Sequence, residues 1–140
     1  MSNQKRVDPA IVGLIGVEAS TLAIMSVLHL TGILTGGTRP YRPTAAGIAE
    51  AVIGAVLTVG AAALARSSRH GRDTAVAALG FAILGVIAGL SFTIRGGGAI
   101  DIAYHATLLP LLLITLAGIS MKPSVRLAPP PSARDSAGMC

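Results

Sequence analysis

Four long runs of apolar residues dominate the chain, and short polar segments separate them. The runs cover residues 10–34, 44–65, 74–94 and 99–121, and consist mostly of alanine, leucine, isoleucine and glycine. Each reaches the roughly 20 residues that a helix needs to cross a hydrocarbon core about 30 Å thick. None alternates apolar and polar residues as the strands of a membrane barrel do. Because lipid offers backbone groups no hydrogen-bond partner, the runs predict transmembrane helices.

We therefore expect an all-α polytopic membrane protein, an antiparallel four-transmembrane-helix bundle that forms a single domain over residues 1–121. The helices are expected at about residues 9–34, 44–66, 73–95 and 99–121. Asp8 with Pro9, and Asp73, are typical start signals for the first and third helices. Residues 122–140 are rich in proline, serine and alanine, so we expect a disordered cytoplasmic tail there.

Composition supports a membrane protein and excludes other classes. Of the 140 residues, 52% are hydrophobic and only 12% are charged, too few to cover a soluble globule. The net charge of +5 does not indicate nucleic acid, because the basic residues flank the runs and only 3% of residues are aromatic and able to stack on bases. No nucleophile motif, phosphate-binding loop or HExxH sequence occurs, so an enzyme is the least supported class. Cys140 is the only cysteine, which excludes an intramolecular disulfide.

The distribution of basic residues predicts the orientation in the membrane. Eight of the eleven lysines and arginines flank the runs on one side, and three on the other. By the positive-inside rule, both termini and the second connection are cytoplasmic. The pattern as a whole resembles small four-helix membrane proteins of bacteria, so we expect the bacterial cytoplasmic membrane. The larger group is Lys5, Arg6, Arg66, Arg69, Arg72, Lys122, Arg126 and Arg134, and the smaller is Arg39, Arg42 and Arg95.

Small residues indicate where helices approach closely. They recur along the second run, for example at Gly47 and Gly54, which predicts a central place for that helix. The third run contains Gly85-x-x-x-Gly89, a pattern typical of close helix packing. Besides the lipid bilayer, the possible partners are therefore a second copy or another membrane protein, held through these small-residue faces.

Ionisable residues inside the runs define a candidate binding site. At 1.5 Å per residue, His29, Glu50 and His105 each lie roughly 8 to 9 Å below the outer ends of their helices. Three helices thus contribute to one level, and Glu18 lies deeper. The candidate site residues are Glu18, His29, Glu50, Arg95, Asp101, Tyr104 and His105.

Helical spacing predicts that these residues share faces. Glu18 and His29 fall on one face of the first helix with Leu22 and Met25. On the fourth helix, the face with Asp101 and His105 becomes apolar at Leu108 and Leu112 before Thr115. This pattern indicates an outward-facing polar pocket that ends near the middle of the membrane. We expect its side chains to converge, with Arg95 or Asp101 close enough to pair.

Each of these residues also has a structural interpretation. Asp101 suits the positive end of its helix, Arg95 can reach the headgroups, and the histidines can hydrogen-bond across helices. Pairing of Glu50 with Arg95 is a further possibility. Glu18 is the hardest to explain, since a deep carboxyl is costly unless it is protonated or partnered.

Three functional classes remain open. Composition favours a structural or accessory membrane component without catalytic activity. The first alternative is a proton- or cation-coupled binding or transport module that uses the His/Glu cluster. The second is a haem-binding redox module with His29 and His105 as axial ligands. If a metal binds, His29, Glu50 and His105 are the expected ligands, although the sequence requires no cofactor.

Overall fold

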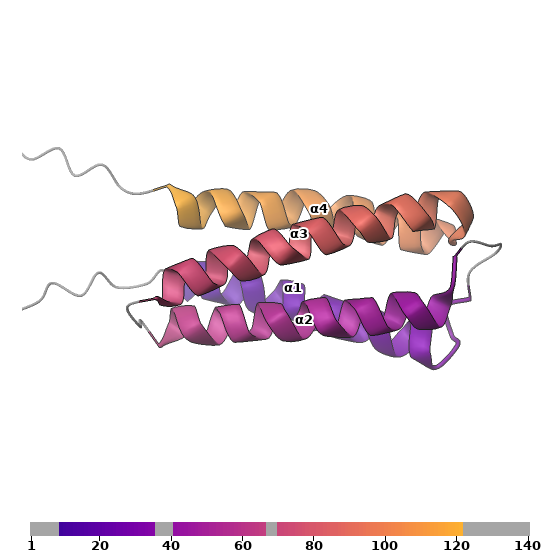
Figure 1. Cartoon of the computed structure of the whole chain (residues 1–140), viewed down its shortest axis with the longest axis horizontal. Helices are drawn as coiled ribbons and strands as arrows, with labels where there is room; N and C mark the ends of the chain where they lie inside the picture. Colours follow the sequence, from indigo (N-terminus) through magenta and orange to yellow (C-terminus); the bar gives the residue numbers. More distant parts are fainter. Residues whose placement is uncertain (1–8, 36–40, 67–69, 122–140) are drawn as a thin grey trace, which may run out of the picture.

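The computed structural model describes residues 9–35, 41–66 and 70–121, which form four α-helices (Figure 1). They are α1 (Pro9–Leu30), α2 (Pro43–Ala65), α3 (Gly71–Gly96) and α4 (Ala99–Ser120). Each helix is long and apolar enough to cross a membrane. The prediction of an all-α, four-span membrane protein is therefore confirmed.

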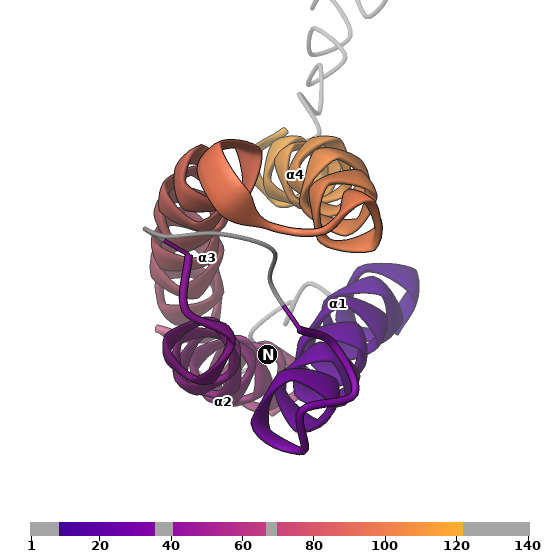
Figure 2. The same ribbon diagram turned by 90° about the vertical axis from the view of Figure 1, so that its right-hand side faces the viewer.

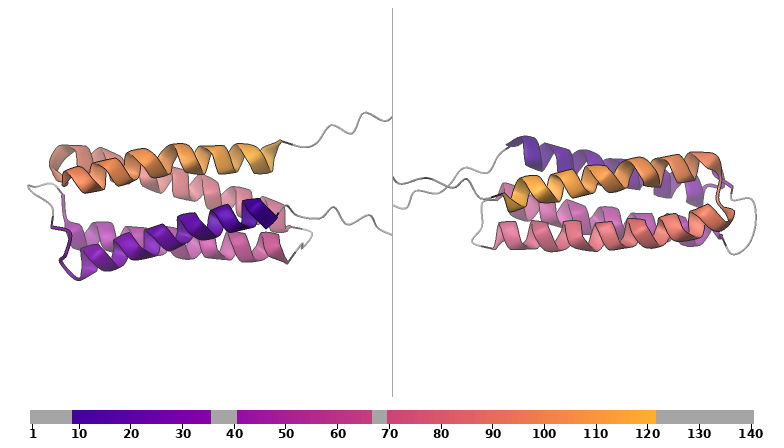
Figure 3. Two further views of the ribbon diagram at one scale, coloured as in Figure 1. Left: turned by 180° about the vertical axis from the view of Figure 1, so that it is seen from behind. Right: turned by 90° about the horizontal axis from the view of Figure 1, so that it is seen from above.

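The helices pack in chain order around a common axis. Figure 2 shows the sequence α1, α2, α3, α4 around the bundle, with α4 returning beside α1. Consecutive helices run in opposite directions, so α1 begins and α4 ends at the same end of the bundle (Figures 1 and 3). We call the opposite end, where α1 leads to α2 and α3 leads to α4, the cluster end. The contact between α1 and α4 is the least extensive of the four.

Both the interior and the outer surface of the bundle are apolar, as expected for a protein surrounded by lipid. The most deeply buried side chains are large and apolar, among them Leu22, Leu57 and Leu112. All four helices also expose large apolar side chains, such as Ile24, Val59, Leu84 and Ile114. Lipid tails cover such a surface without penalty, since they are as apolar as leucine.

Glycines bring neighbouring helices into close contact. A Cβ atom on Gly60 of α2 would lie 2.7 Å from the Cβ atom of Ala78 in α3. The two glycines of the G-x-x-x-G pattern face different helices. A Cβ on Gly85 would lie 2.5 Å from Ile53 of α2, and one on Gly89 would lie 2.8 Å from His105 of α4. Both glycines thus serve packing within the chain.

Two helix ends differ from the sequence prediction. The first helix ends at Leu30 rather than at residue 34, because Gly32 adopts a left-handed conformation with φ of 74°. The Gly32 N–H donates to the carbonyl of His29 at 3.2 Å and closes the last turn. The third helix begins at Gly71, ahead of the predicted Asp73. Asp73 lies instead within the first turn, where a carboxylate favours the positive end of the helix dipole.

The carbonyls at the end of α4 have a partner from α3. The guanidinium of Arg72 donates to the carbonyl of Ile119 at 2.6 Å and to that of Ser120 at 3.1 Å. These carbonyls have no partner within their own helix.

Some sequence predictions concern residues that the structure does not describe. These are the tail at 122–140, the Asp8 start signal and the segments 36–40 and 67–69. The expectations for them stay predictions.

Candidate functional site

Four polar side chains from different parts of the chain meet at the cluster end. His29 comes from the last turn of α1, Glu50 from α2 and Asp101 from the first turn of α4. Tyr41 comes from the segment just before α2. The exposed fraction of each residue is 8% or less. We call these four residues the histidine cluster.

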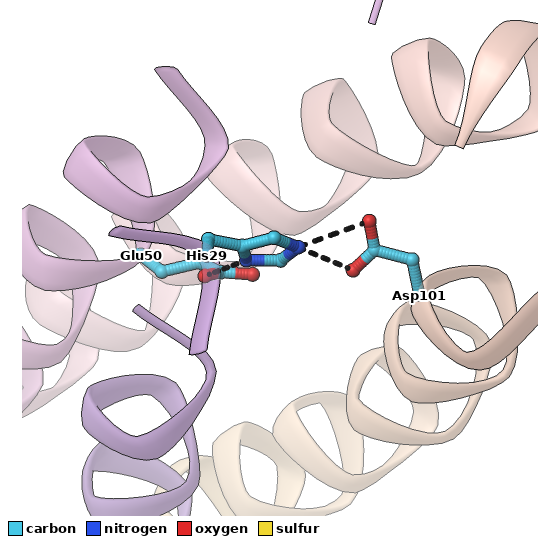
Figure 4. A group of neighbouring side chains, drawn as sticks. All are labelled: His29, Glu50 and Asp101. Atoms are coloured by element: carbon cyan, nitrogen blue, oxygen red, sulfur yellow. Dashed lines mark hydrogen bonds and ion pairs between the residues drawn. The ribbon is translucent and has the colours of Figure 1, made fainter. Parts of the chain in front are cut away.

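The imidazole ring of His29 lies between two carboxyl groups (Figure 4). Its Nδ1 atom is 2.8 Å from Oε2 of Glu50. Its Nε2 atom is 3.2 Å from Oδ2 of Asp101 and also 3.2 Å from Oδ1, although only Oδ2 has hydrogen-bond geometry. A ring with protons on both nitrogens donates to both carboxylates, whereas a neutral ring donates to only one. The number of protons in the cluster therefore decides which of its hydrogen bonds exist.

Tyr41 completes the cluster from outside the helices. Its hydroxyl donates to Oδ2 of Asp101 and lies 2.8 Å from Nε2 of His29. Burial raises the pKa of the Tyr41 phenol above its ordinary value, and the hydrogen bond to Asp101 and the negative charges of Asp101 and Glu50 raise it further. The Tyr41 hydroxyl thus remains a hydrogen-bond donor across the physiological pH range.

Close packing between α1 and α2 places Glu50 beside His29. A Cβ atom on Gly47 would lie 3.0 Å from both the Cβ atom of His29 and the carbonyl oxygen of Ser26. The Ser26 hydroxyl donates to the Gly47 carbonyl at 2.7 Å. Glu50 follows Gly47 by about one helical turn, so the same face of α2 carries its carboxyl to the ring.

Two buried carboxyl oxygens of the cluster have no hydrogen-bond partner among the described residues. Among the described residues, no group hydrogen-bonds to Oε1 of Glu50 or to Oδ1 of Asp101. The only ion pairs between described residues are the two that His29 makes. With both carboxyl groups ionised, the cluster is negatively charged even when the ring carries two protons. The site therefore has both the charge and the free oxygen atoms to accept a further proton or another cation.

The geometry permits a metal, with ligands that differ from the predicted set. His29, Glu50 and Asp101 each offer one ligand atom, and these atoms lie within 4.8 Å of one another. Asp101 takes the place expected for His105, whose Nδ1 lies 2.9 Å from the backbone carbonyl of Asp101. Because the ring separates the two carboxyls, a metal on Nε2 would have Asp101 and Tyr41 beside it. Glu50 would then orient the ring through Nδ1, as carboxylates do for metal-bound histidines.

Glu18 belongs to a second polar contact deeper in the bundle. It is fully buried, and its Oε1 accepts a hydrogen bond of 2.6 Å from the Thr115 hydroxyl of α4. Its Oε2 has no partner among the described residues. Nearby, the Tyr104 hydroxyl donates to Thr21 at 3.3 Å. Together with the His29–Asp101 pair, the Glu18–Thr115 and Thr21–Tyr104 pairs make three polar links between α1 and α4.

Two alternatives that the sequence left open find little support in the contacts of these residues. Arg95 is exposed and forms no ion pair with a described residue, so the Glu50–Arg95 pair that the sequence allowed is absent there. For haem, both ring nitrogens of His29 already have partners, and the His105 ring lies against Gly89. Ligation by both histidines would require these contacts to break.

Tyr41 is the cluster residue that the sequence analysis missed. It lies in the connection 35–43, TGGTRPYRP, outside the four apolar runs from which the candidate site residues were mostly drawn. One signal was present: Tyr41 precedes the Pro43 helix start by two positions, and this brings it to the level of the last turn of the first helix.

No family model matches the chain, and no curated protein or solved structure does either.

Proposed function

We propose that this four-span membrane protein is a proton-coupled binding module whose histidine cluster takes up and releases protons. One observation carries the proposal: a buried imidazole has a carboxyl from a different helix at each ring nitrogen. Histidine is the side chain whose ordinary titration falls nearest physiological pH. Intramembrane ionisable groups are costly, and they commonly mark proton or ion pathways.

The cluster provides a short route for a proton. In one state, Glu50 is protonated, His29 carries its proton on Nε2, and Asp101 is ionised. Transfer of the Glu50 proton to Nδ1 and of the Nε2 proton to Asp101 gives the second state. Glu50 is then ionised, the ring is neutral again, and Asp101 is protonated. No other bond changes.

The direction of this route follows from the helix positions. Asp101 lies in the first turn of α4, at the cluster end, whereas Glu50 lies roughly 10 Å along α2 from Pro43. The relay thus joins the end of the bundle to a carboxyl farther inside. Tyr41, which keeps its proton, donates to Asp101 and stabilises the ionised form of that carboxyl.

A purely structural role is the competing interpretation. Buried polar networks that only stabilise a fold are normally fully hydrogen-bonded. The histidine cluster instead leaves one oxygen of each carboxyl without a hydrogen-bond partner among the described residues. An incomplete network of this kind favours a site that exchanges a proton or cation over one that only holds helices together.

Infrared spectroscopy of the full chain in lipid nanodiscs tests the proposal. Spectra recorded from about pH 5 to about pH 9 cover the range in which histidine ordinarily titrates. We expect the C=O band of protonated carboxyls to change reversibly over this range. Glu50→Gln or Asp101→Asn should remove that change. Glu18→Gln is the matched control, because it removes a carboxyl outside the cluster and should leave the change intact.

A constant carboxyl band in the folded wild-type protein would instead support the structural interpretation. The spectra should also be recorded after treatment with a chelator. If the pH-dependent change persists, protons alone account for it. If it disappears on chelation and returns with zinc, the cluster is a metal site and the proton relay is wrong.

A further inference from the structure

A cavity of about 500 Å³ lies beside the histidine cluster, between α2 and α3. Its walls are mainly apolar, and Leu22 of α1 and His105 of α4 reach it from the interior. Several lining residues are exposed on the outer surface of the bundle, including Val52, Phe81 and Phe92. The cavity therefore opens sideways, toward the lipid that surrounds a membrane bundle.

Aromatic side chains gather at this cavity. The chain has only two tyrosines and two phenylalanines, and Tyr41, Phe81 and Phe92 all line it. Aromatic faces attract cations as well as apolar groups. A volume of this size is within the range of pockets that hold small organic ligands.

Two polar residues of the wall, Glu50 and His105, offer hydrogen-bond acceptors to the cavity, whereas the Tyr41 and Thr93 hydroxyls donate to groups of the chain itself and Arg42 is exposed. Glu50 lines the cavity, is 3% exposed, and has an Oε1 atom without a partner among the described residues. His105 also lines it. Its Nδ1 is 2.9 Å from a backbone carbonyl, so Nδ1 carries a proton there, and in the neutral ring Nε2 is an acceptor. A ligand that complements this wall needs an apolar body and a positively charged donor.

We propose that the cavity binds an amphiphilic ammonium ion that enters from the bilayer, with the Glu50 carboxylate as its counter-ion. This inference depends on the proposed function, because the ligand and the relayed proton compete for the same carboxyl. When Glu50 passes its proton through His29 to Asp101, it becomes available to the ammonium group. Return of the proton to Glu50 releases the ligand.

Other ionisable groups around Glu50 decide how strongly the cavity prefers an ammonium ion to an anion. His29 of α1 pairs with Glu50, Asp101 of α4 lies at the other nitrogen of the same ring, and His105 of α4 lines the same cavity. Arg42, just before α2, is exposed and lines the cavity. An anionic amphiphile held by Arg42 is therefore the natural competitor. It would bring its apolar tail against the unpartnered Glu50 oxygen, which disfavours it.

Three probes of nearly equal shape distinguish these ligands: 4-phenylbutylamine, 4-phenylbutanol and 4-phenylbutyrate. Binding of each to the full chain in nanodiscs is measured by titration calorimetry, with empty nanodiscs as the control for partition into lipid. We expect the amine to bind at least roughly tenfold more tightly than the alcohol or the acid, since a charge-assisted hydrogen bond is lost in both. Amine binding should also release protons, because the proton that Glu50 passes to Asp101 then leaves Asp101 for water at the cluster end.

Two kinds of variant locate the site. Glu50→Gln should weaken amine binding roughly tenfold or more. Ala88→Phe fills the cavity from the exposed face of α3 without changing the cluster, and it should also abolish binding. Ala77→Phe places the same side chain at an exposed position of α3 outside the cavity, so it should bind the amine as the wild type does.

Each contrary result has a distinct meaning. Equal binding of amine and alcohol, tighter binding of the acid, or unchanged amine binding by Ala88→Phe would overturn the ammonium site. If the amine does not bind but the infrared change of Glu50 persists, this inference fails and the proposed function stands. If the infrared change is also absent, the proposed function fails.

Discussion

Tyr41 is held in the histidine cluster by its hydroxyl proton. Burial and the neighbouring Asp101 raise its pKa above the ordinary value of about 10, so the protonated phenol is favoured in the fold. Its stabilising effect is fully present below about pH 10 and is lost as the pH rises through the higher pKa of the folded state.

The variant Tyr41→Phe should lower stability at pH 8 by about 1–3 kcal/mol, because it leaves Asp101 without its hydroxyl donor. The difference from the wild type should shrink above about pH 10, because the phenol then ionises in the unfolded protein while it stays protonated in the fold. Thermal unfolding in detergent over a pH series measures this. A difference that stays constant to about pH 11 would contradict a proton-dependent role for Tyr41.

Thr115 is the partner of a fully buried carboxyl, and its removal should be costly. Thr115→Val leaves Oε1 of Glu18 without its 2.6 Å hydrogen bond, and we expect a loss of about 1–3 kcal/mol. The double variant Glu18→Leu, Thr115→Val should recover much of this loss, since replacing both partners removes the unsatisfied group. Thr107→Val is the matched control, because Thr107 is exposed and bonds only to its own helix. Equal losses in Thr107→Val and Thr115→Val would show that the Glu18 contact contributes nothing.

At the residue scale, helical spacing predicted which positions face inward. Glu18, His29, Asp101 and His105 are all buried, as their shared faces implied. The pairing itself was not predictable, because it depends on the rotation of one helix against another. Tyr41 was missed for a related reason: only the tertiary fold brings a connecting segment over the end of α1.

At the scale of the helices, Gly47 fixes the distance between α1 and α2. A Cβ there would lie 2.9 Å from Leu30 and 3.0 Å from the Ser26 carbonyl, so a methyl group must push the helices apart. Gly47→Ala should lower stability by about 1–3 kcal/mol and weaken the infrared signal of Glu50. Gly13→Ala is the control, since its Cβ would meet nothing within 4 Å and alanine favours a helix. Retention of both stability and signal in Gly47→Ala would contradict this role of Gly47.

The helices themselves were predictable from length and composition, whereas their ends were not. Lipid requires each apolar run to satisfy its own backbone, which leaves little choice but a helix. The end of α1 depends instead on the left-handed conformation of Gly32, one of several glycines in that run. This early end moves His29 into the last turn, closer to the end of the bundle than the sequence suggested.

For the whole molecule, four spans place the start of α1 and the end of α4 on one side of the membrane. The basic residues predict that this side is the cytoplasm. Reporter fusions after Thr35 and after Gly97 should report the outer side, and a fusion after His70 the inner side. The reverse pattern would overturn the orientation, although not the fold. In the predicted orientation, the histidine cluster faces the outside.

Polar side chains hold together the two helices that contact each other least, α1 and α4. The contact between α1 and α4 is the least extensive, and it contains the pairs His29–Asp101, Thr21–Tyr104 and Glu18–Thr115. A helix contact that depends on hydrogen bonds to ionisable groups changes in strength when a proton is added to or removed from those groups. The proposed proton exchange in the cluster would thus change the contact between the first and last helices.

The most direct test of proton exchange is the protonation of the His29 ring itself. Nitrogen-15 NMR of histidine-labelled protein in nanodiscs reports whether each ring nitrogen carries a proton, and His70→Gln and His105→Gln identify the His29 signals. We predict that the Nδ1 and Nε2 signals of His29 change reversibly from about pH 5 to about pH 9, and that Glu50→Gln alters this change. A His29 ring that keeps one protonation state throughout, and is the same in folded Glu50→Gln, would contradict the proposed function.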